Sequence, residues 1–175
     1  NGRETEAGTT SLIKNNMFPS KQPSTLLKVD GATHTFNAMS GVTHRGTSAA
    51  LSALIHDEVY AEIIGDGVHV SDDALKLFFK AKPEDKVILI SDALPITYSD
   101  MKETVFADSK IYYDGDKATS ADGTIAGSTK LLPEIIKILG KKGMFKPRFI
   151  ENTYRYHGLE PMGEIEWDED FNPRF

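Results

Sequence analysis

The chain has 175 residues, of which 39% are hydrophobic and 26% charged, with a formal net charge of −6 and no cysteine. This length predicts one domain or a part of a larger one, and the lack of cysteine excludes disulfides, zinc–thiolate sites and cysteine nucleophiles. The acidic balance argues against general nucleic-acid binding. Because no apolar run approaches the ~20 residues of a membrane span and the polar start lacks a signal-peptide core, we expect a cytoplasmic protein without a membrane partner.

Hydrophobic periodicity predicts alternating strands and helices after a poorly patterned N-terminal segment, residues 1–30. Thr47 or Ser48 is suited to cap the first helix, whose apolar face would hold Ala50, Leu51, Leu54 and Ile55. The predicted elements are a helix at 46–57, a strand at 59–64, a helix from Ser71 that Pro83 stops, a strand at 87–90, two β-like pieces at 103–107 and 110–113, helices at 129–139 and 145–156, and a last strand at 163–167.

The helix at 129–139 is amphipathic, with glycines after it and an acidic tail from Asp168 that we expect to be frayed. Gly140 and Gly143 are placed to end this helix. Its predicted inward side chains are Leu131, Leu132, Ile135, Ile136 and Leu139.

The βα order predicts an α/β fold with a parallel sheet. About three βα units are present, whereas a complete (β/α)8 barrel has eight units and ~250 residues. The sequence is therefore consistent with a smaller open sheet or with part of a barrel.

A short strand or helix end is also predicted at 25–29. Polar side chains follow this segment and the strands at 59–64 and 87–90, and strand ends are where parallel α/β proteins place their chemistry. His34, His69 and Asp92 each come from a different unit. Histidine supplies a neutral nitrogen to a divalent metal, and aspartate binds metal weakly or moves a proton. Together they suggest metal-assisted hydrolysis.

Each of these residues also has a structural interpretation. A single His after a strand is more often a surface or structural residue, and Asp92 could cap a turn. Asn37 could be a turn former, and Arg45 a solvated charge. The small-residue stretch from Gly123 to Ser128 suits an anion or substrate oxygen at a helix start, or a tight loop with a Ser128 cap.

Four motifs, taken jointly, resemble the N-acetylglucosamine-6-phosphate deacetylases of the amidohydrolase superfamily. Their order and spacing are similar to those of the family over about residues 31–140. The motifs are Thr33-His34-Thr35-Phe36-Asn37-Ala38-Met39 with Arg45, Ile64-Gly65-Asp66-Gly67-Val68-His69-Val70, Ile90-Ser91-Asp92-Ala93, and Gly123-Thr124-Ile125-Ala126-Gly127-Ser128.

The resemblance implies a metal-dependent (β/α)8 TIM barrel with a small β domain. Residues 31–157 would be part of the barrel, and residues 158–175 would return toward the small domain. The reaction implied is hydrolysis of N-acetylglucosamine 6-phosphate to acetate and glucosamine 6-phosphate. The cofactor implied is a divalent metal ion, zinc first, with iron, cobalt or manganese as alternatives, and the partner implied is a second copy in a homodimer.

The resemblance also implies a role for each motif residue. His34 would bind the metal, and Asp92 would be the general base and then the general acid. Arg45 would pair with the phosphate across a dimer interface, and His69 would hold the sugar in place of the metal role first suggested. The remaining substrate contacts implied are Asn37, Ala38, Asp66, Gly67, Val68, Ile125, Ala126 and Gly127.

The chain departs from the family pattern before His34. The family needs a further metal-ligand Glu and a further His earlier in the chain, and no His precedes His34. We therefore expect this chain to correspond to the C-terminal half of such an enzyme. The alternatives are a remnant that folds or binds phosphosugar without activity, and an amidohydrolase with another N-acyl substrate.

This departure predicts that the isolated 175-residue chain has little or no deacetylase activity. Release of acetate from N-acetylglucosamine 6-phosphate with added zinc is the measurement. Turnover near that of a full-length relative would contradict the prediction.

Overall fold

The structure, a computed structural model, describes residues 29–174. The expectations for residues 1–28 therefore lie outside the described residues. The described chain divides into two compact units. The first comprises residues up to Ile63, Lys76–Ile88 and Pro147–Pro161, and the second comprises Ile64–Leu75, Leu89–Lys146 and the residues from Met162.

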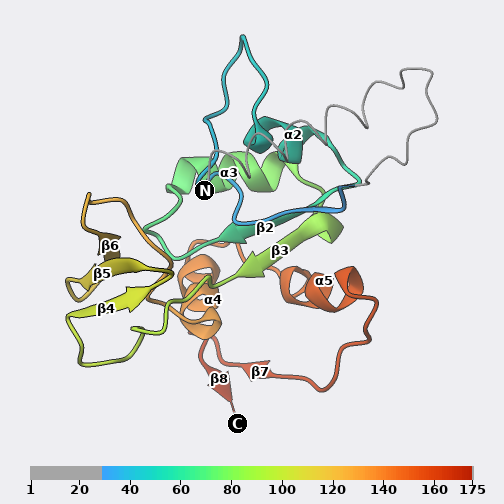
Figure 1. The fold of residues 1–175 in the computed structure, drawn as a ribbon. Helices are drawn as coiled ribbons and strands as arrows, with labels where there is room; N and C mark the ends of the chain where they lie inside the picture. Colours follow the sequence, from blue (N-terminus) through green and yellow to red (C-terminus); the bar gives the residue numbers. More distant parts are fainter. Residues whose placement is uncertain (1–28, 175) are drawn as a thin grey trace. The chain divides into compact units, whose positions relative to one another are not determined.

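Three short strands form a sheet in the order β1-β2-β3 (Figure 1). They are β1 (Gly31–Ala32), β2 (Tyr60–Ile64) and β3 (Val87–Ile90). β1 pairs with β2 in parallel, with Ala32 opposite Ala61. The α/β class and the parallel pairing predicted from the sequence are thus confirmed, and among the described residues this sheet has three strands and is not a closed barrel.

In the first unit, helix α2 (Ala49–Ile55) begins at Ser48, whose hydroxyl accepts a hydrogen bond from the Leu51 amide at 3.1 Å. The predicted cap is therefore confirmed. The predicted apolar face is only partly correct, because Ile55 is 56% exposed. The buried stripe runs instead through small residues at i, i+4 spacing, which allow close packing. Its members are Ala49, Ala50, Ser52, Ala53 and Leu54.

Two buried polar side chains hold the first unit together. Lys82 is 3% exposed and donates to the carbonyl oxygens of Ala53 at 2.8 Å and His56 at 2.5 Å, so that it satisfies the last turn of α2. Burial lowers the pKa of Lys82 to about 8, against the attraction of Asp57 and Glu58. A buried ammonium is tolerated here because it meets backbone acceptors.

Asn152 of α5 (Arg148–Tyr156) is fully buried and joins this helix to the chain before β3. Its amide nitrogen donates to the carbonyls of Glu84 at 2.8 Å and Val87 at 2.7 Å. Glu84 belongs to the 3-10 helix η1 (Glu84–Lys86), which follows Pro83. α5 thus takes its position from an amide that satisfies two backbone acceptors as well as from apolar packing.

The second unit contains a three-stranded antiparallel sheet in the order β4-β5-β6. Ile111 of β5 and Ala118 of β6 pack in a small core with Leu94 and Ile96. The first two strands follow the prediction, whereas β6 was not predicted. The strands are β4 (Glu103–Phe106), β5 (Ser109–Tyr113) and β6 (Ala118–Ser120).

Helix α4 (Leu132–Lys141) corrects two sequence-based expectations. Leu131 was expected to point inward, but it is the N-cap residue and is 40% exposed. Gly140 was expected to end the helix, but it lies within it, and a Cβ there would come within 2.5 Å of the Phe171 ring. Its lack of a side chain therefore lets Phe171 lie directly on α4.

The tail that was expected to fray forms a hairpin in the second unit. β7 (Glu166–Trp167) pairs with β8 (Pro173–Arg174), and β7 is shorter than the predicted strand at 163–167. The Asp168 carboxylate accepts hydrogen bonds from the side chain of Asn172 and from its backbone N–H, the latter at 2.8 Å. This local turn explains why acidic residues remain ordered here.

The longest helices of the described range have ten residues, and one of them, α3 (Asp72–Ala81), follows β2 in the chain. Within residues 29–174, none of the helices has the length and apolarity needed to cross a membrane.

Replacing Asn152 with Ala is predicted to lower the free energy of unfolding by about 1–3 kcal/mol, because the buried Val87 carbonyl and the partly buried Glu84 carbonyl lose their donor. Urea denaturation followed by circular dichroism measures the change. The matched control is Glu151→Ala, one residue earlier on the more exposed side of α5, which should change stability by about 0.5 kcal/mol or less. Equal effects of the two substitutions would contradict this role for Asn152.

Candidate functional site

The predicted site residues share one position relative to the strands. His34, Asp66 and Asp92 each lie two residues beyond the last residue of β1, β2 and β3, respectively. In parallel α/β folds this carboxyl end of the strands is where ligands bind. Each of these residues therefore follows the carboxyl end of its own strand, His34 in the first unit and Asp66 and Asp92 in the second, and their roles stay predictions.

The turn after β1 is strained. His34, Phe36 and Ala38 all have positive φ, at 31°, 79° and 54°. The Asn37 side chain bonds back to the His34 carbonyl at 3.3 Å, so this residue does act as a turn former. Non-glycine residues hold such conformations only when their surroundings impose them, and they concentrate at functional sites.

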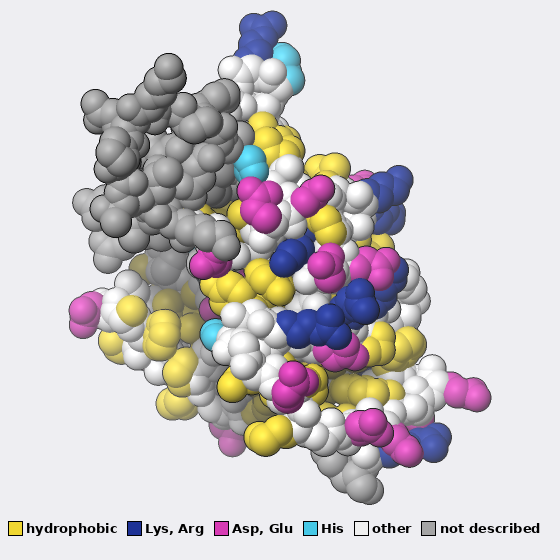
Figure 2. Space-filling view, turned by 90° about the vertical axis from the view of Figure 1, so that its right-hand side faces the viewer, with side chains coloured by type: hydrophobic (Ala, Val, Ile, Leu, Met, Phe, Trp, Pro, Cys, Tyr) yellow, Lys and Arg dark blue, Asp and Glu magenta, His cyan; other side chains and the backbone are white. Residues whose placement is uncertain are grey.

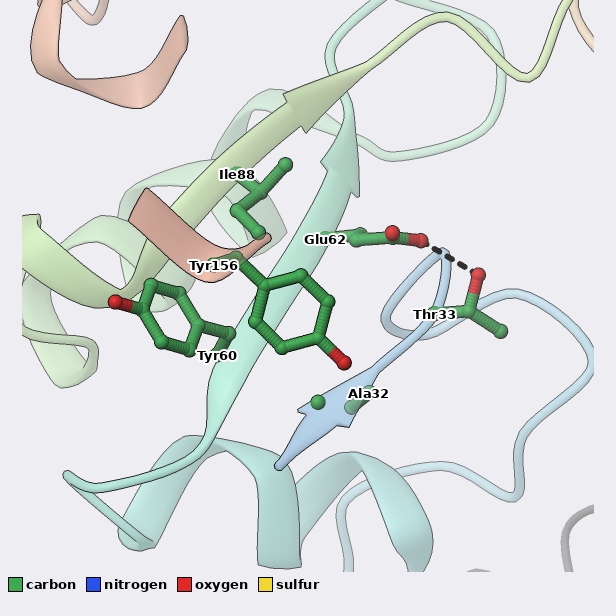
Figure 3. A pocket seen from close by; sticks show the side chains of 7 residues that line it. Ala32, Thr33, Tyr60, Glu62, Ile88 and Tyr156 are labelled. Carbon is green, nitrogen blue, oxygen red and sulfur yellow. Dashed lines mark hydrogen bonds between the residues drawn. The ribbon is translucent and has the colours of Figure 1, made fainter. Parts of the chain in front are cut away.

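Glu62 of β2 supports this turn and was not singled out in the sequence. Its carboxylate accepts from the Thr33 hydroxyl at 2.5 Å and from the His34 amide at 3.4 Å. The period-two alternation of β2 could have revealed it, since Tyr60 and Glu62 share one face of the strand. Both line a cavity of about 100 Å³ together with Tyr156 (Figure 3).

The His34 ring offers one ligand position for a metal. Its Nδ1 atom is buried and has no hydrogen-bond partner in the described structure, as expected of a nitrogen that awaits a ligand. A zinc site needs three or more protein ligands. Among residues 29–174, however, no three or more His, Asp and Glu side chains come together in a way that could hold an ion. Among the described residues, His34 is therefore the one side chain that we can assign as a ligand of the predicted metal.

Arg45 lies in the exposed loop between the turn after β1 and α2, residues 40–47. This loop stands at the top of Figure 1, and in Figure 2 a basic and a histidine side chain stand at its end. An arginine there can approach a phosphate bidentately.

In the second unit, the loop after β2 is built around the buried Asp66 carboxylate. Oδ1 accepts from the backbone amides of Val68 and His69, both at 2.9 Å. Oδ2 accepts from Nδ1 of His69 and from the hydroxyl of Ser128, both at 2.8 Å. Burial raises the pKa of Asp66, but these hydrogen bonds outweigh burial and hold the pKa well below its usual range.

The His69 imidazole is bonded through both nitrogens. Nδ1 meets Asp66, and Nε2 lies 2.6 Å from the carbonyl oxygen of Ala126. Burial lowers the pKa of His69, but the hydrogen bonds to Asp66 and Ala126 and the charges of Asp66 and Asp92 raise it overall. With both nitrogens engaged, the ring has no lone pair directed at a metal. This argues against the role of metal ligand that was first suggested for His69.

Asp92 is held through its backbone by the loop that was predicted to line the pocket. The Ser128 amide donates to the Asp92 carbonyl at 2.8 Å, and the Leu94 amide donates to the Ser128 carbonyl at 2.9 Å. Gly127 lies so close that a Cβ would be 2.5 Å from the Asp92 oxygen. Asp92 has φ 49°, and its side chain is exposed. The structure thus brings Asp66, His69 and Asp92 into one hydrogen-bonded arrangement with the loop.

Ser128 is the second residue whose role the sequence did not show. The prediction that Ser128 caps the helix is wrong, because Leu131 is the N-cap of α4. The Ser128 hydroxyl accepts instead from the Lys130 amide at 3.1 Å, in the loop before the helix. Its bond to Asp66 spans 62 positions of the chain, which no local pattern reveals.

Comparison with known proteins finds similar sugar-phosphate deacetylases. An N-acetylglucosamine-6-phosphate deacetylase of Bacillus subtilis is 40% identical over 98 residues, covering 55% of this chain and 24% of that protein. An N-acetylgalactosamine-6-phosphate deacetylase of a Shewanella species is 33% identical over 98 residues, covering 56% of this chain and 25% of that protein. The chain is related to the amino-sugar 6-phosphate deacetylases.

Solved structures of these deacetylases share the fold. That of Thermotoga maritima matches with a TM-score of 0.73 and 25% identity, covering 82% of this chain and 44% of that one. That of Mycobacterium smegmatis in complex with N-acetyl-D-glucosamine-6-phosphate matches with a TM-score of 0.75 and 23% identity, covering 82% and 42%. No protein-family model matches the chain. The chain thus spans about a quarter of the length of these two curated relatives and under half of these structures.

The pair of Asp66 and His69 predicts a specific pH dependence of stability. Because the pKa of His69 is raised on folding, its contribution is complete below the ordinary value of 6.5 and is lost as pH rises through the folded pKa. Because the pKa of Asp66 is lowered, its contribution is present above 3.8 and is lost only as pH falls toward the folded pKa. The free energy of unfolding should therefore decrease from pH 6.5 upward in this window.

Urea unfolding at a series of pH values measures this dependence. His69→Gln should remove the decrease above pH 6.5 and lower stability by about 1–3 kcal/mol. His157→Gln, at the C-cap of α5, is the control for the loss of a histidine. A pH dependence that persists in His69→Gln would contradict the assignment.

Proposed function

We propose that the chain carries part of the active site of a metal-dependent amide hydrolase, which converts N-acetylglucosamine 6-phosphate to acetate and glucosamine 6-phosphate. The observation that carries the proposal is the common position of His34, Asp66 and Asp92, two residues beyond the carboxyl ends of β1, β2 and β3. The names of the related deacetylases supply the reaction. The reaction belongs to the breakdown of amino sugars.

Asp92 is the proposed proton carrier. In hydrolysis, a water oxygen bonds to the acetyl carbon, the carbon–nitrogen bond breaks, and a proton of that water goes to the leaving amine. The exposed Asp92 carboxylate would take this proton as general base and return it as general acid. A divalent metal ion, zinc first, with His34 as one ligand, would supply the polarisation of the carbonyl and the water.

Arg45 is the proposed phosphate ligand. A guanidinium pairs with phosphate through two parallel hydrogen bonds, and the exposed loop at 40–47 leaves room for a ligand of this size. We propose that a second copy of the chain forms a homodimer in which Arg45 reaches the neighbouring substrate.

The sugar and acetyl group would meet the turn after β1 and the loop at 123–128. Asn37 and Ala38 would contact the sugar from the first, and Ile125, Ala126 and Gly127 would line the pocket from the second. Gly67, Val68 and His69 would shape its wall next to Asp66. The half-buried Ala126 and Gly127 form a small-residue surface, which suits a neutral acetyl amide.

The galactosamine epimer is a second candidate substrate. The Shewanella relative that is 33% identical is named for N-acetylgalactosamine 6-phosphate. The two sugars differ only in the orientation of one hydroxyl, so phosphate and acetyl contacts would serve both.

Arg45→Ala is predicted to weaken the binding of N-acetylglucosamine 6-phosphate about 10- to 150-fold, the equivalent of one charge-assisted contact of about 1.5–3 kcal/mol. Isothermal titration calorimetry of the chain with this ligand, with its galactosamine epimer and with unphosphorylated N-acetylglucosamine measures the loss and the epimer preference.

Arg155→Ala is the matched control, since Arg155 is a half-exposed arginine that lies 3.7 Å from Glu151 on α5. It should leave binding unchanged. The proposal is wrong if the unaltered chain binds neither phosphosugar at millimolar concentration, or if Arg45→Ala and Arg155→Ala bind equally.

A further inference from the structure

A hydrogen-bonded network in the second unit joins Asp66, His69, Ala126 and Ser128. Its donors and acceptors fix the charge state of His69. We call it the Asp66 network. Side-chain exposure is 1% for Asp66 and 6% for His69, so water cannot replace the protein partners. Each bond in the network must therefore have one donor and one acceptor from the protein itself.

The His69 ring faces acceptors on both sides. A backbone carbonyl has no proton to give, and the Asp66 carboxylate already accepts from three other donors. A neutral imidazole has one N–H and could satisfy only one side, leaving either the 2.8 Å contact to Asp66 or the 2.6 Å contact to Ala126 without a proton. The imidazolium has two N–H groups and satisfies both.

The charges around the ring agree with this state. Asp66 is in direct contact, and the Asp92 charge acts in the same direction from the loop after β3. The lysine nearest along the neighbouring loop, Lys130, lies 3.2 Å from Asp116. The groups that act on the ring are thus the carboxylates of Asp66 and Asp92 and the carbonyl oxygen of Ala126. All three favour the protonated ring.

The network also reaches the predicted base. From Asp66, one path runs through His69 to the Ala126 carbonyl, and a second runs through the Ser128 hydroxyl. Ser128 in turn pairs with Asp92 and Leu94 through its main chain. Both ends of the segment 126–128 therefore depend on one carboxylate.

We propose that Asp66 is a positioning residue, which holds His69 as a doubly donating imidazolium and thereby fixes the segment Ala126–Ser128 against Asp92. The roles of Asp92 and the segment in turnover rest on the proposed function, but the charged network does not. His69 then acts on the substrate through Ala126, whose carbonyl it orients. The pocket is in its binding arrangement only while His69 carries its charge.

Nitrogen-15 NMR of the histidine ring tests the charge state in the unaltered chain. At pH 6.5, where an ordinary histidine is half protonated, His69 should be mostly protonated with both ring nitrogens carrying hydrogen. In Asp66→Asn, which keeps the shape but removes the charge, the titration midpoint of His69 should move to lower pH. A single N–H on His69 of the unaltered chain at this pH would overturn the proposal.

Asp114→Asn is the matched control. Asp114 also accepts from the amides two and three residues later, but it is exposed and belongs to the turn after β5. It should leave the His69 midpoint unchanged. If Asp66→Asn does not fold, the spectrum of the unaltered chain decides the charge state, and Ser128→Ala decides the second path by faster hydrogen exchange at the Leu94 amide. Unchanged exchange there would overturn that path.

The effect on ligand binding separates positioning from mere stability. Affinity for N-acetylglucosamine 6-phosphate, measured at pH 7 and above where the phosphate is mostly dianionic, should fall as pH rises through the His69 midpoint. The fall should begin at lower pH in Asp66→Asn. Affinity that does not change with His69 protonation would overturn the positioning role. If no phosphosugar binds at all while His69 is an imidazolium, the proposed function fails and the charged network stands.

Discussion

The strand-end arrangement of the second unit depends on one buried carboxylate. Asp66 is nearly inaccessible to solvent, and an unpaired charge in such a place costs several kcal/mol. Its four donors come from Val68, His69 and Ser128, and they offset that cost. Because the donors lie on two chain segments, satisfying the charge also fixes the loop after β2 to the loop before α4. Asp92 receives its place from the second of these loops.

The turns at the strand ends use backbone conformations that an unsupported chain avoids. His34, Phe36 and Ala38 after β1, and Asp92 after β3, have positive φ without being glycine, and Gly67 after β2 has φ 80°. Each non-glycine case costs about 1–3 kcal/mol. The compensating bonds come from Glu62 in the first unit and from the Asp66 network in the second. Positive φ thus occurs after the carboxyl end of each of the three strands.

The sequence predicted those parts of the fold that depend on local pattern. β3 has the predicted bounds because Val87–Ile90 is a continuous apolar run. β6 (Ala118–Ser120) was missed because its three small residues have no strand pattern and become a strand only by pairing with β5. The site residues at the strand ends came from motifs, whereas the bond between Ser128 and Asp66 depends on tertiary contact. The period-two alternation of β2 could have revealed Glu62, but its bonds to Thr33 and His34 are also tertiary contacts.

The proposed function requires that this chain binds a phosphorylated N-acetyl amino sugar. Titrating N-acetylglucosamine 6-phosphate into the nitrogen-15-labelled chain and mapping amide shift changes by residue tests it most directly. Amide shift changes are expected mainly in residues 33–45, 66–69, 91–93 and 124–128. Changes confined to other segments, such as α5 or β4 to β6, or no changes at millimolar ligand, would contradict it.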